Sequence, residues 1–150
     1  MDKLVVEASI EIDASPARVW TVLTSPAFTS RWSPLFGATG PIDSDWNSGS
    51  QVLWRNADGA VYVQGNVVAM RPEALLTFTC RSVDPKMMPL SGLTEDDITQ
   101  TYTLSDSGGR TTLSIAHGDF SKLAGGADIY PRAREGWNGI LARIKALAEE

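Results

Sequence analysis

The stretch YPRAREGWNGILARIKALA, residues 130–148, has the spacing of a long amphipathic helix. Arg132, Glu135 and Arg143 fall on one side, and the apolar residues fall on the other. The apolar set is Tyr130, Ala133, Trp137, Ile140, Leu141, Ile144, Leu147 and Ala148. Such a helix is about 25 Å long, and its apolar face must be covered. The rest of the chain should therefore supply a sheet.

The chain before this helix has the patterns of β-strands. Residues 4–12 place apolar side chains at every second position, which predicts one half-buried strand. The segments QVLWRN, AVYVQGNVVAM and ALLTFTCR predict a three-stranded antiparallel meander. The segments DITQTYTL and RTTLSIAH, joined by DSGG at 106–109, predict a further hairpin. Gly65 interrupts the longest strand, which indicates a bulge or sharp bend and a curved sheet.

The stretch SPARVWTVLTSPAFTSRWSPL, residues 15–35, predicts two short helices in tandem. Ser15 offers a side-chain acceptor for the first helix, and Pro16 fits its first position. Pro26 disfavours a helical conformation in the residue before it, so a second helix follows and runs toward Trp32. Residues 36–50, rich in Gly, Ser, Asp and Pro, predict a loop.

The predicted fold is α+β, and a single domain covers residues 1–150. A six-stranded curved antiparallel sheet wraps around the long C-terminal helix, with the two short helices after the first strand. A domain of this length buries roughly 70% of the surface that its unfolded chain exposes. The space between helix and sheet is the candidate site.

Three motifs carry a resemblance to a known superfamily. They are IEIDASPARVWTVLT, GNVVAMRPEALLTFTC, and HGDF followed by GWNGILARIKALAEE. In these motifs and in the order of its elements, the chain resembles the START-like (SRPBCC) helix-grip superfamily, and within it the Aha-type proteins, homologues of activators of the heat-shock chaperone ATPase. The resemblance implies the helix-grip fold. The functions that it implies include those of lipid carriers, hormone receptors and polyketide cyclases.

Composition excludes several classes of function. A formal net charge of −5, with no block of Lys or Arg, disfavours nucleic acid and anionic membranes as partners. One His and one Cys do not make a zinc site of the ordinary type, and no calcium loop, P-loop or G-x-G-x-x-G motif occurs. We therefore expect neither a metal nor a cofactor.

The cellular setting follows from similar features. No apolar run approaches the roughly 20 residues needed to cross a bilayer, so we expect no membrane insertion. Cys80 has no second cysteine to pair with, and it alternates with Leu76 and Phe78 on a strand as a small buried side chain. The N-terminus alternates and does not form an apolar signal core. A cytoplasmic protein is the expectation.

Three polar residues are predicted to share one concave surface. His117 continues the inward alternation of Leu113 and Ile115, as an acid, base or ligand anchor, or as a structural histidine bonded to a backbone carbonyl. Gln100 and Tyr102 either line the cavity with it or reach solvent near the end of their strand. Among these residues and their neighbours, His117 and Asp119 are the candidates for proton transfer.

Aromatic and aliphatic residues of the expected helices and strands, and of the loop that follows, are predicted to contact the apolar part of a ligand. They are Trp32, Phe36, Trp54, Phe78, Trp137 and Leu141. Trp32 lies either at the mouth of the cavity or in a hydrophobic plug. Met87 and Met88, on the loop DPKMMPLSGL, form a lid, a partner contact or part of the core.

Three functional hypotheses remain from the sequence. The first is a module that binds a small, mainly hydrophobic molecule through His117, Gln100 and Tyr102. The second is a cyclase- or hydratase-like enzyme that uses the same cavity, with His117 or Asp119 moving a proton. The third is a co-chaperone or protein-interaction role, and a protein partner or a homodimer stays open.

Overall fold

A computed structural model describes residues 3–32, 41–55, 58–83, 98–123 and 125–150. Its elements are β1 (Val6–Ile12), α1 (Pro16–Thr24), α2 (Pro26–Trp32), β2 (Ile42–Asp43), β3 (Gln51–Arg55), β4 (Val61–Arg71), β5 (Leu75–Ser82), β6 (Ile98–Ser107), β7 (Arg110–Gly118), the 3₁₀ turn η2 (Phe120–Lys122) and α4 (Gly126–Ala148). The strands form one antiparallel sheet in the order β1-β7-β6-β5-β4-β3-β2. The predicted α+β class and helix-grip arrangement are confirmed.

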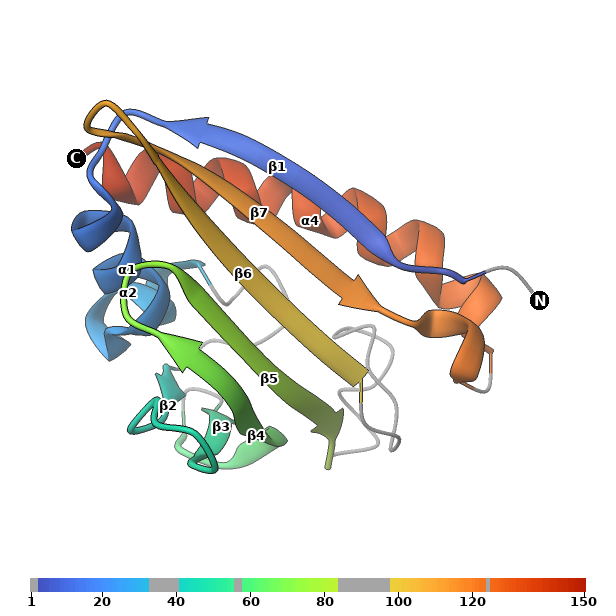
Figure 1. The fold of residues 1–150 in the computed structure, drawn as a ribbon. Coiled ribbons are helices and arrows are strands. Elements are labelled where there is room, and N and C mark those ends of the chain that lie inside the picture. The colour runs from blue at the N-terminus through green and yellow to red at the C-terminus, as the bar shows by residue number, and fades with distance from the viewer. Residues whose placement is uncertain (1–2, 33–40, 56–57, 84–97, 124) are drawn as a thin grey trace.

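The long helix covers one face of the curved sheet. In Figure 1, α4 runs behind β1 and β7 and ends beside α1 and α2. Its buried residues are Gly126, Trp137, Ile140, Leu141, Ile144, Leu147 and Ala148, which include most of the predicted stripe. The helix begins about one turn before residue 130, because Gly125 adopts a left-handed conformation (φ 71°) and its carbonyl accepts from the amide of Ile129 at 3.2 Å.

The number of strands differs from the prediction. The sheet has seven strands, because the two-residue strand β2 lies inside the segment 36–50 that was predicted to be a loop. Ile42 pairs with Trp54, and Asp43 pairs with Leu53. Two residues are too few for an alternating pattern to be visible in the sequence.

The two short helices begin and end as predicted. Ser15 Oγ accepts from the amide of Arg18 at 3.2 Å and caps α1, and Ser25 is extended between α1 and α2. Arg18 also donates to the last carbonyls of α4, with Nη2 at 3.1 Å from Leu147 O and Nε at 3.3 Å from Ala148 O. These bonds satisfy carbonyls that a helix end leaves unpaired, so α1 holds the C-terminal end of α4 in place.

The strand β4 has the predicted curvature, and its bulges lie on either side of Gly65 rather than at this residue. A Cβ atom on Gly65 would lie 1.7 Å from the carbonyl oxygen of Thr79, so glycine is required there by the close approach of β5. The register shifts lie on either side, at Tyr62 opposite β3 and at Val68 opposite β5. These bulges fall within the strand that Gly65 interrupts, and they add curvature to it.

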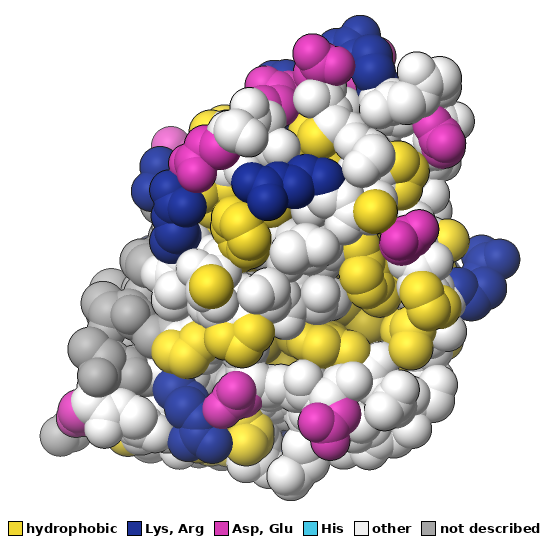
Figure 2. Space-filling view, turned by 90° about the vertical axis from the view of Figure 1, so that its left-hand side faces the viewer, with side chains coloured by type: hydrophobic (Ala, Val, Ile, Leu, Met, Phe, Trp, Pro, Cys, Tyr) yellow, Lys and Arg dark blue, Asp and Glu magenta, His cyan; other side chains and the backbone are white. Residues whose placement is uncertain are grey.

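Figure 2 shows the side of the molecule on which α1, α2 and the C-terminus lie. Hydrophobic side chains form a band across the middle of this face, and acidic and basic side chains stand on both sides of the band. Trp20 and Phe28, from α1 and α2, are partly buried and pack against the core. Among the described residues, no helix is long and apolar enough to cross a membrane.

Candidate ligand-binding site

Three polar side chains of the sheet are buried in the interior. Gln100 and Tyr102 on β6 are 1% and 2% exposed, and His117 on β7 is 1% exposed. Gln100 and His117 are register partners, so their side chains meet on the same face. Of the two placements that the sequence left open for Gln100 and Tyr102, the structure has the interior one.

His117 connects the sheet to α4. The indole Nε1 of Trp137 donates to His117 Nδ1 at 2.9 Å, and the two rings meet edge to face with centroids 5.8 Å apart. On its other side, His117 Nε2 lies 3.5 Å from Gln100 Nε2. Within the described residues, the hydrogen-bonding partners of this imidazole are therefore side chains of α4 and β6, and none is the backbone carbonyl considered from the sequence.

Burial keeps the imidazole neutral. It lowers the pKa of His117 to about 3. Because Nδ1 accepts from Trp137, the one proton of the neutral ring is on Nε2, where it faces Gln100. The carboxamide oxygen of Gln100 accepts a hydrogen bond from this N–H when it is turned toward the ring. With such a pKa, His117 is a weak base at neutral pH, and the geometry suits it to orienting its neighbours.

The polar groups converge without satisfying one another fully. The Tyr102 hydroxyl lies 3.5 Å from Gln100 Oε1, the same length as the contact between Gln100 and His117. Good hydrogen bonds between nitrogen and oxygen are about 2.7–3.2 Å long. Among the described residues, Gln100 Nε2 has one further contact, the thiol sulfur of Cys80 at 3.4 Å. These buried groups therefore keep hydrogen-bonding capacity for another polar atom.

Asp119 is engaged in a structural role. Its Oδ1 accepts from the amide of Leu4 at 2.8 Å, and from the amide and hydroxyl of Ser121 at 2.9 and 2.6 Å. The hydrogen bond from the Ser121 side chain, followed by the bond from the Leu4 amide, lowers the pKa of Asp119 to about 2. This carboxylate holds the entry to β1 and the η2 turn, so we do not assign it proton transfer.

A row of aromatic rings runs through the interior. Ring centroids are 5.9 Å apart for Trp46 and Phe78, 5.9 Å for Phe78 and Tyr102, and 6.0 Å for Tyr102 and Trp137. Such edge-on and tilted contacts are favourable for aromatic side chains. The row brings together Phe78 and Trp137, two of the predicted apolar contacts, with the polar group around Tyr102.

The other residues that were predicted to contact the ligand are also buried, as far as they belong to the described part of the chain. Trp32 is 1% exposed, and its indole donates to Val22 O at 2.8 Å, which fixes α2 against α1. Trp54 is fully buried on β3, and Leu141 lies on the buried face of α4. Phe36, Met87 and Met88 lie outside the described residues.

The aromatic residues of the interior that the sequence analysis missed include Trp46 and Tyr62. Trp46 lies in the predicted loop, yet it is only 9% exposed, and its indole donates to Thr24 O at 3.0 Å. Tyr62 is fully buried and packs edge to face on Trp54, with centroids 6.4 Å apart. Tyr62 stands in a run of four apolar residues, 60–63, in which no alternation marks an inward side.

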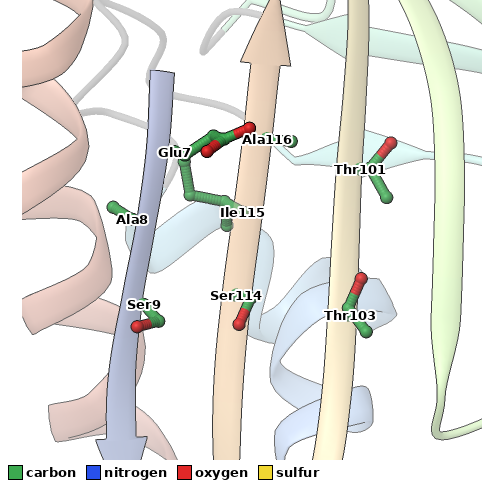
Figure 3. Close-up of a pocket in the computed structure, with 8 residues that line it drawn as sticks. All are labelled: Glu7, Ala8, Ser9, Thr101, Thr103, Ser114, Ile115 and Ala116. Atoms are coloured by element: carbon green, nitrogen blue, oxygen red, sulfur yellow. The ribbon is translucent and has the colours of Figure 1, made fainter. Parts of the chain in front are cut away.

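Two surface hollows bounded by described residues lie away from this interior. One, of about 420 Å³, crosses the outer face of β1, β7 and β6 and is lined by small and hydroxyl side chains such as Ser9, Ser114 and Thr103 (Figure 3). The other, of about 370 Å³, lies beside β2 and β3 and includes Asp43 and Asp45. Neither includes a predicted site residue. No group of three or more His, Cys, Asp or Glu in the described ranges is arranged to hold a metal ion.

A curved antiparallel sheet, held against a long C-terminal helix over an aromatic interior with a few polar groups, defines a START-like helix-grip protein. The profile of one family within that superfamily, described as activator of Hsp90 ATPase homolog 1-like protein, matches residues 13–149, and the chain belongs to this family. A search of functionally curated proteins found no match.

Solved structures share the fold at low sequence identity. Protein MLL2253 from Mesorhizobium loti superposes with a TM-score of 0.74 at 21% identity, over 95% of each chain. CalU16 from Micromonospora echinospora has a TM-score of 0.70 at 17% identity, over 96% of this chain and 75% of its own. The Aha1 dimer from Colwellia psychrerythraea has a TM-score of 0.70 at 18% identity, over 97% of this chain and 96% of its own.

Proposed function

We propose that the interior between α4 and the sheet binds one small, mainly hydrophobic molecule. The observation that carries this proposal is the group Gln100, Tyr102 and His117, which is fully buried but joined by contacts of 3.5 Å. Buried polar atoms are normally well paired. A ligand oxygen or nitrogen, placed among them, supplies the hydrogen bonds that they do not make with one another.

The surroundings suit a ligand that is apolar over most of its surface. The aromatic row of Trp46, Phe78, Tyr102 and Trp137 offers ring faces and edges, and Leu141 adds an aliphatic side chain from α4. Removal of apolar surface from water contributes about 25 cal/mol per Å² before the costs of ordering are subtracted. Polar groups then fix the orientation of the ligand more than they supply affinity.

Neither alternative has an observation of equal weight. An enzyme that uses His117 as a general base needs a pKa near the working pH, and burial holds the pKa of His117 at about 3. A co-chaperone or protein-interaction role would use a sheet edge or the loop with Met87 and Met88, and these two residues lie outside the described ones. The dimer of Aha1 from Colwellia psychrerythraea makes a homodimer a reasonable proposal for this chain, and ligand binding does not depend on it.

Native mass spectrometry of the purified, unsupplemented protein tests the proposal, together with tryptophan fluorescence titrations with a fatty acid, a sterol and an aromatic polyketide. We expect a co-purified mass or saturable quenching at one molecule per chain. The variant Gln100→Leu should weaken binding roughly tenfold, since a buried hydrogen bond is lost. The control Thr103→Val changes an outward-facing residue of the same strand and should bind as the wild type does. A bare mass with no response to any probe would refute the proposal.

A further inference from the structure

Tyr62 carries a buried hydroxyl that the proposed function has not yet used. The residue is fully buried, and its Oη has no hydrogen-bond partner in the part of the chain that the structure describes. Its ring packs on Trp54. A phenylalanine would fill the same space without burying an unpaired polar atom, and an unpaired buried hydroxyl costs stability. Such an exception in a packed interior requires a physical reason.

The position of Tyr62 follows from the bulge in β4. Trp54 pairs with Val63 while Arg55 pairs with Val61, so Tyr62 is the extra residue between two paired positions. A bulge redirects the side chain at that point. Tyr62 and Val63 are consequently both buried, although successive residues of a regular strand point to opposite faces.

Tyr62 and Tyr102 belong to one buried cluster of the interior, together with Cys80. Burial raises the pKa of both Tyr62 and Tyr102, and in each case the electrostatic interaction with the Cys80 thiol adds to the rise. Gln100 Nε2 contacts the same sulfur at 3.4 Å. Cys80 therefore lies in the same buried cluster as both tyrosines and contacts Gln100. Both tyrosines keep their protons at neutral pH and remain hydrogen-bond donors.

The interior around this group carries no charge. Among the described residues, the buried polar side chains other than the tyrosines are Thr29, Gln100, Thr111 and His117, and His117 is neutral. No described Lys, Arg, Asp or Glu is buried. A ligand carboxylate placed here would lose its hydration without gaining a cationic partner, which is costly.

We propose that the Tyr62 hydroxyl donates a hydrogen bond to an acceptor oxygen of an uncharged ligand, such as a ketone, ester or ether, and that it makes the site prefer such ligands over carboxylates of the same shape. This inference rests on the proposed function. It adds a specificity-determining residue to the predicted site and narrows the class of ligand. The Gln100 and Tyr102 side chains bind the same ligand from β6, which is separated from β4 by β5.

Three probes of one shape test the inference by isothermal titration calorimetry. They are 2-acetylnaphthalene, which is neutral with an acceptor oxygen, 2-naphthoate, which is anionic, and 2-ethylnaphthalene, which has no acceptor. We expect the wild type to bind the ketone most tightly and the carboxylate most weakly at neutral pH. Tyr62→Phe should weaken the binding of the ketone roughly tenfold and leave the affinity for the hydrocarbon unchanged.

The matched control is Tyr130→Phe, which removes a hydroxyl that donates to Val5 O at 3.4 Å, a backbone acceptor on the N-terminal side of β1. It should leave the affinity for all three probes unchanged. Unfolding of the ligand-free variants gives a second measurement. Tyr62→Phe should be as stable as the wild type or more stable, because it removes an unpaired buried hydroxyl.

The outcomes separate this inference from the proposed function. If 2-ethylnaphthalene and 2-acetylnaphthalene both bind but Tyr62→Phe weakens neither, the role of Tyr62 is refuted and the binding function stands. If 2-naphthoate binds as tightly as the ketone, the preference for uncharged ligands is refuted. If none of the three probes binds the wild type, the proposed function fails and this inference fails with it.

Discussion

His117 couples protonation to stability, because burial lowers its pKa to about 3 while an unfolded histidine has a pKa of about 6.5. As the pH falls, the unfolded chain therefore binds a proton at this residue before the folded chain does. The contribution of neutral His117 to stability is complete above about pH 6.5. It falls by up to about 1.4 kcal/mol per pH unit below that value, until the folded form is also protonated.

The variant His117→Asn tests this linkage. Asparagine offers an acceptor to the Trp137 indole but does not titrate. We expect the free energy of unfolding of the wild type, measured by urea denaturation, to fall between about pH 6.5 and about pH 4.5, where most carboxylates are still ionised. The variant should be less stable at neutral pH and nearly independent of pH over this range. An equal slope in both proteins would show that His117 is not the titrating group.

Asp119 gives a second prediction at this scale, because its role depends on accepting hydrogen bonds from Leu4 and Ser121. Asp119→Asn keeps an acceptor oxygen, whereas Asp119→Ala removes it. Thermal unfolding at neutral pH should show a clearly larger loss in Tm for alanine than for asparagine. Since the pKa is lowered to about 2, the ionised carboxylate stabilises the fold above its ordinary pKa, and this contribution is lost as the pH falls toward 2. Equal losses in the two variants would contradict the hydrogen-bonding role.

Residues of the site could be predicted only where a strand is regular. Alternation along β6 and β7 predicted that Gln100, Tyr102 and His117 share a face, because neither strand is interrupted there. The burial of Tyr62 was not predicted, because the bulge breaks the alternation of β4 at that residue. The bond between Trp137 and His117 joins a helix to a strand, and no local pattern contains it.

At the scale of the element, α4 contains two glycines that its packing does not require. A Cβ atom on Gly136 or Gly139 would meet nothing within 4 Å. Replacement of each by alanine should raise the free energy of unfolding by up to about 1 kcal/mol, because glycine is the poorer helix former. Urea denaturation of both single variants measures the effect. A loss of stability would indicate that α4 requires flexibility at these positions.

Gly65 in β4 should behave in the opposite way. A side chain there overlaps the backbone of β5 at Thr79, and backbone cannot move aside as a flexible side chain can. Gly65→Ala should therefore destabilise the protein by about 3 kcal/mol. A stability equal to that of the wild type would mean that β4 and β5 lie farther apart than described.

The elements were predictable in proportion to their length and regularity. The ends of α1 and α2 followed from Ser and Pro, whose effects are local. The strand β2 was not predicted, because two residues show no period. It is defined by its pairing with β3. The early start of α4 depends on Gly125 in a left-handed conformation, which the spacing of apolar residues does not reveal.

At the scale of the whole molecule, a ligand held between α4 and the sheet should stabilise the fold, since the site exists only when both are in place. At a concentration of 2-acetylnaphthalene 100 times its Kd, the gain is about 2.7 kcal/mol. For a chain of this size, Tm should rise by roughly 5–10 °C. Differential scanning calorimetry measures the rise. Gln100→Leu should need roughly tenfold more ligand for the same rise, and identical behaviour of the two proteins would place the ligand elsewhere.

The overall architecture was predictable because the apolar faces of a long helix and a curved sheet need each other, and this follows from their periods. The motifs that resemble the START-like superfamily pointed to the same fold, and the family match over residues 13–149 confirms it. The sequence predicted a small, mainly hydrophobic ligand but not the preference for an uncharged acceptor that we propose. That proposal depends on how a few side chains, such as Tyr62 and Gln100, are paired in the interior, and pairing is a property of the folded structure.

The most direct test of the account is an NMR titration that follows the indole N–H signals of the five tryptophans as 2-acetylnaphthalene is added to the ¹⁵N-labelled protein. Trp137 donates to His117 inside the proposed site, whereas Trp20 is only partly buried on α1. The account predicts that the Trp137 signal shifts saturably at one molecule per chain while the Trp20 signal stays in place. A Trp137 signal that does not move, or shifts confined to Trp20, would contradict binding between α4 and the sheet.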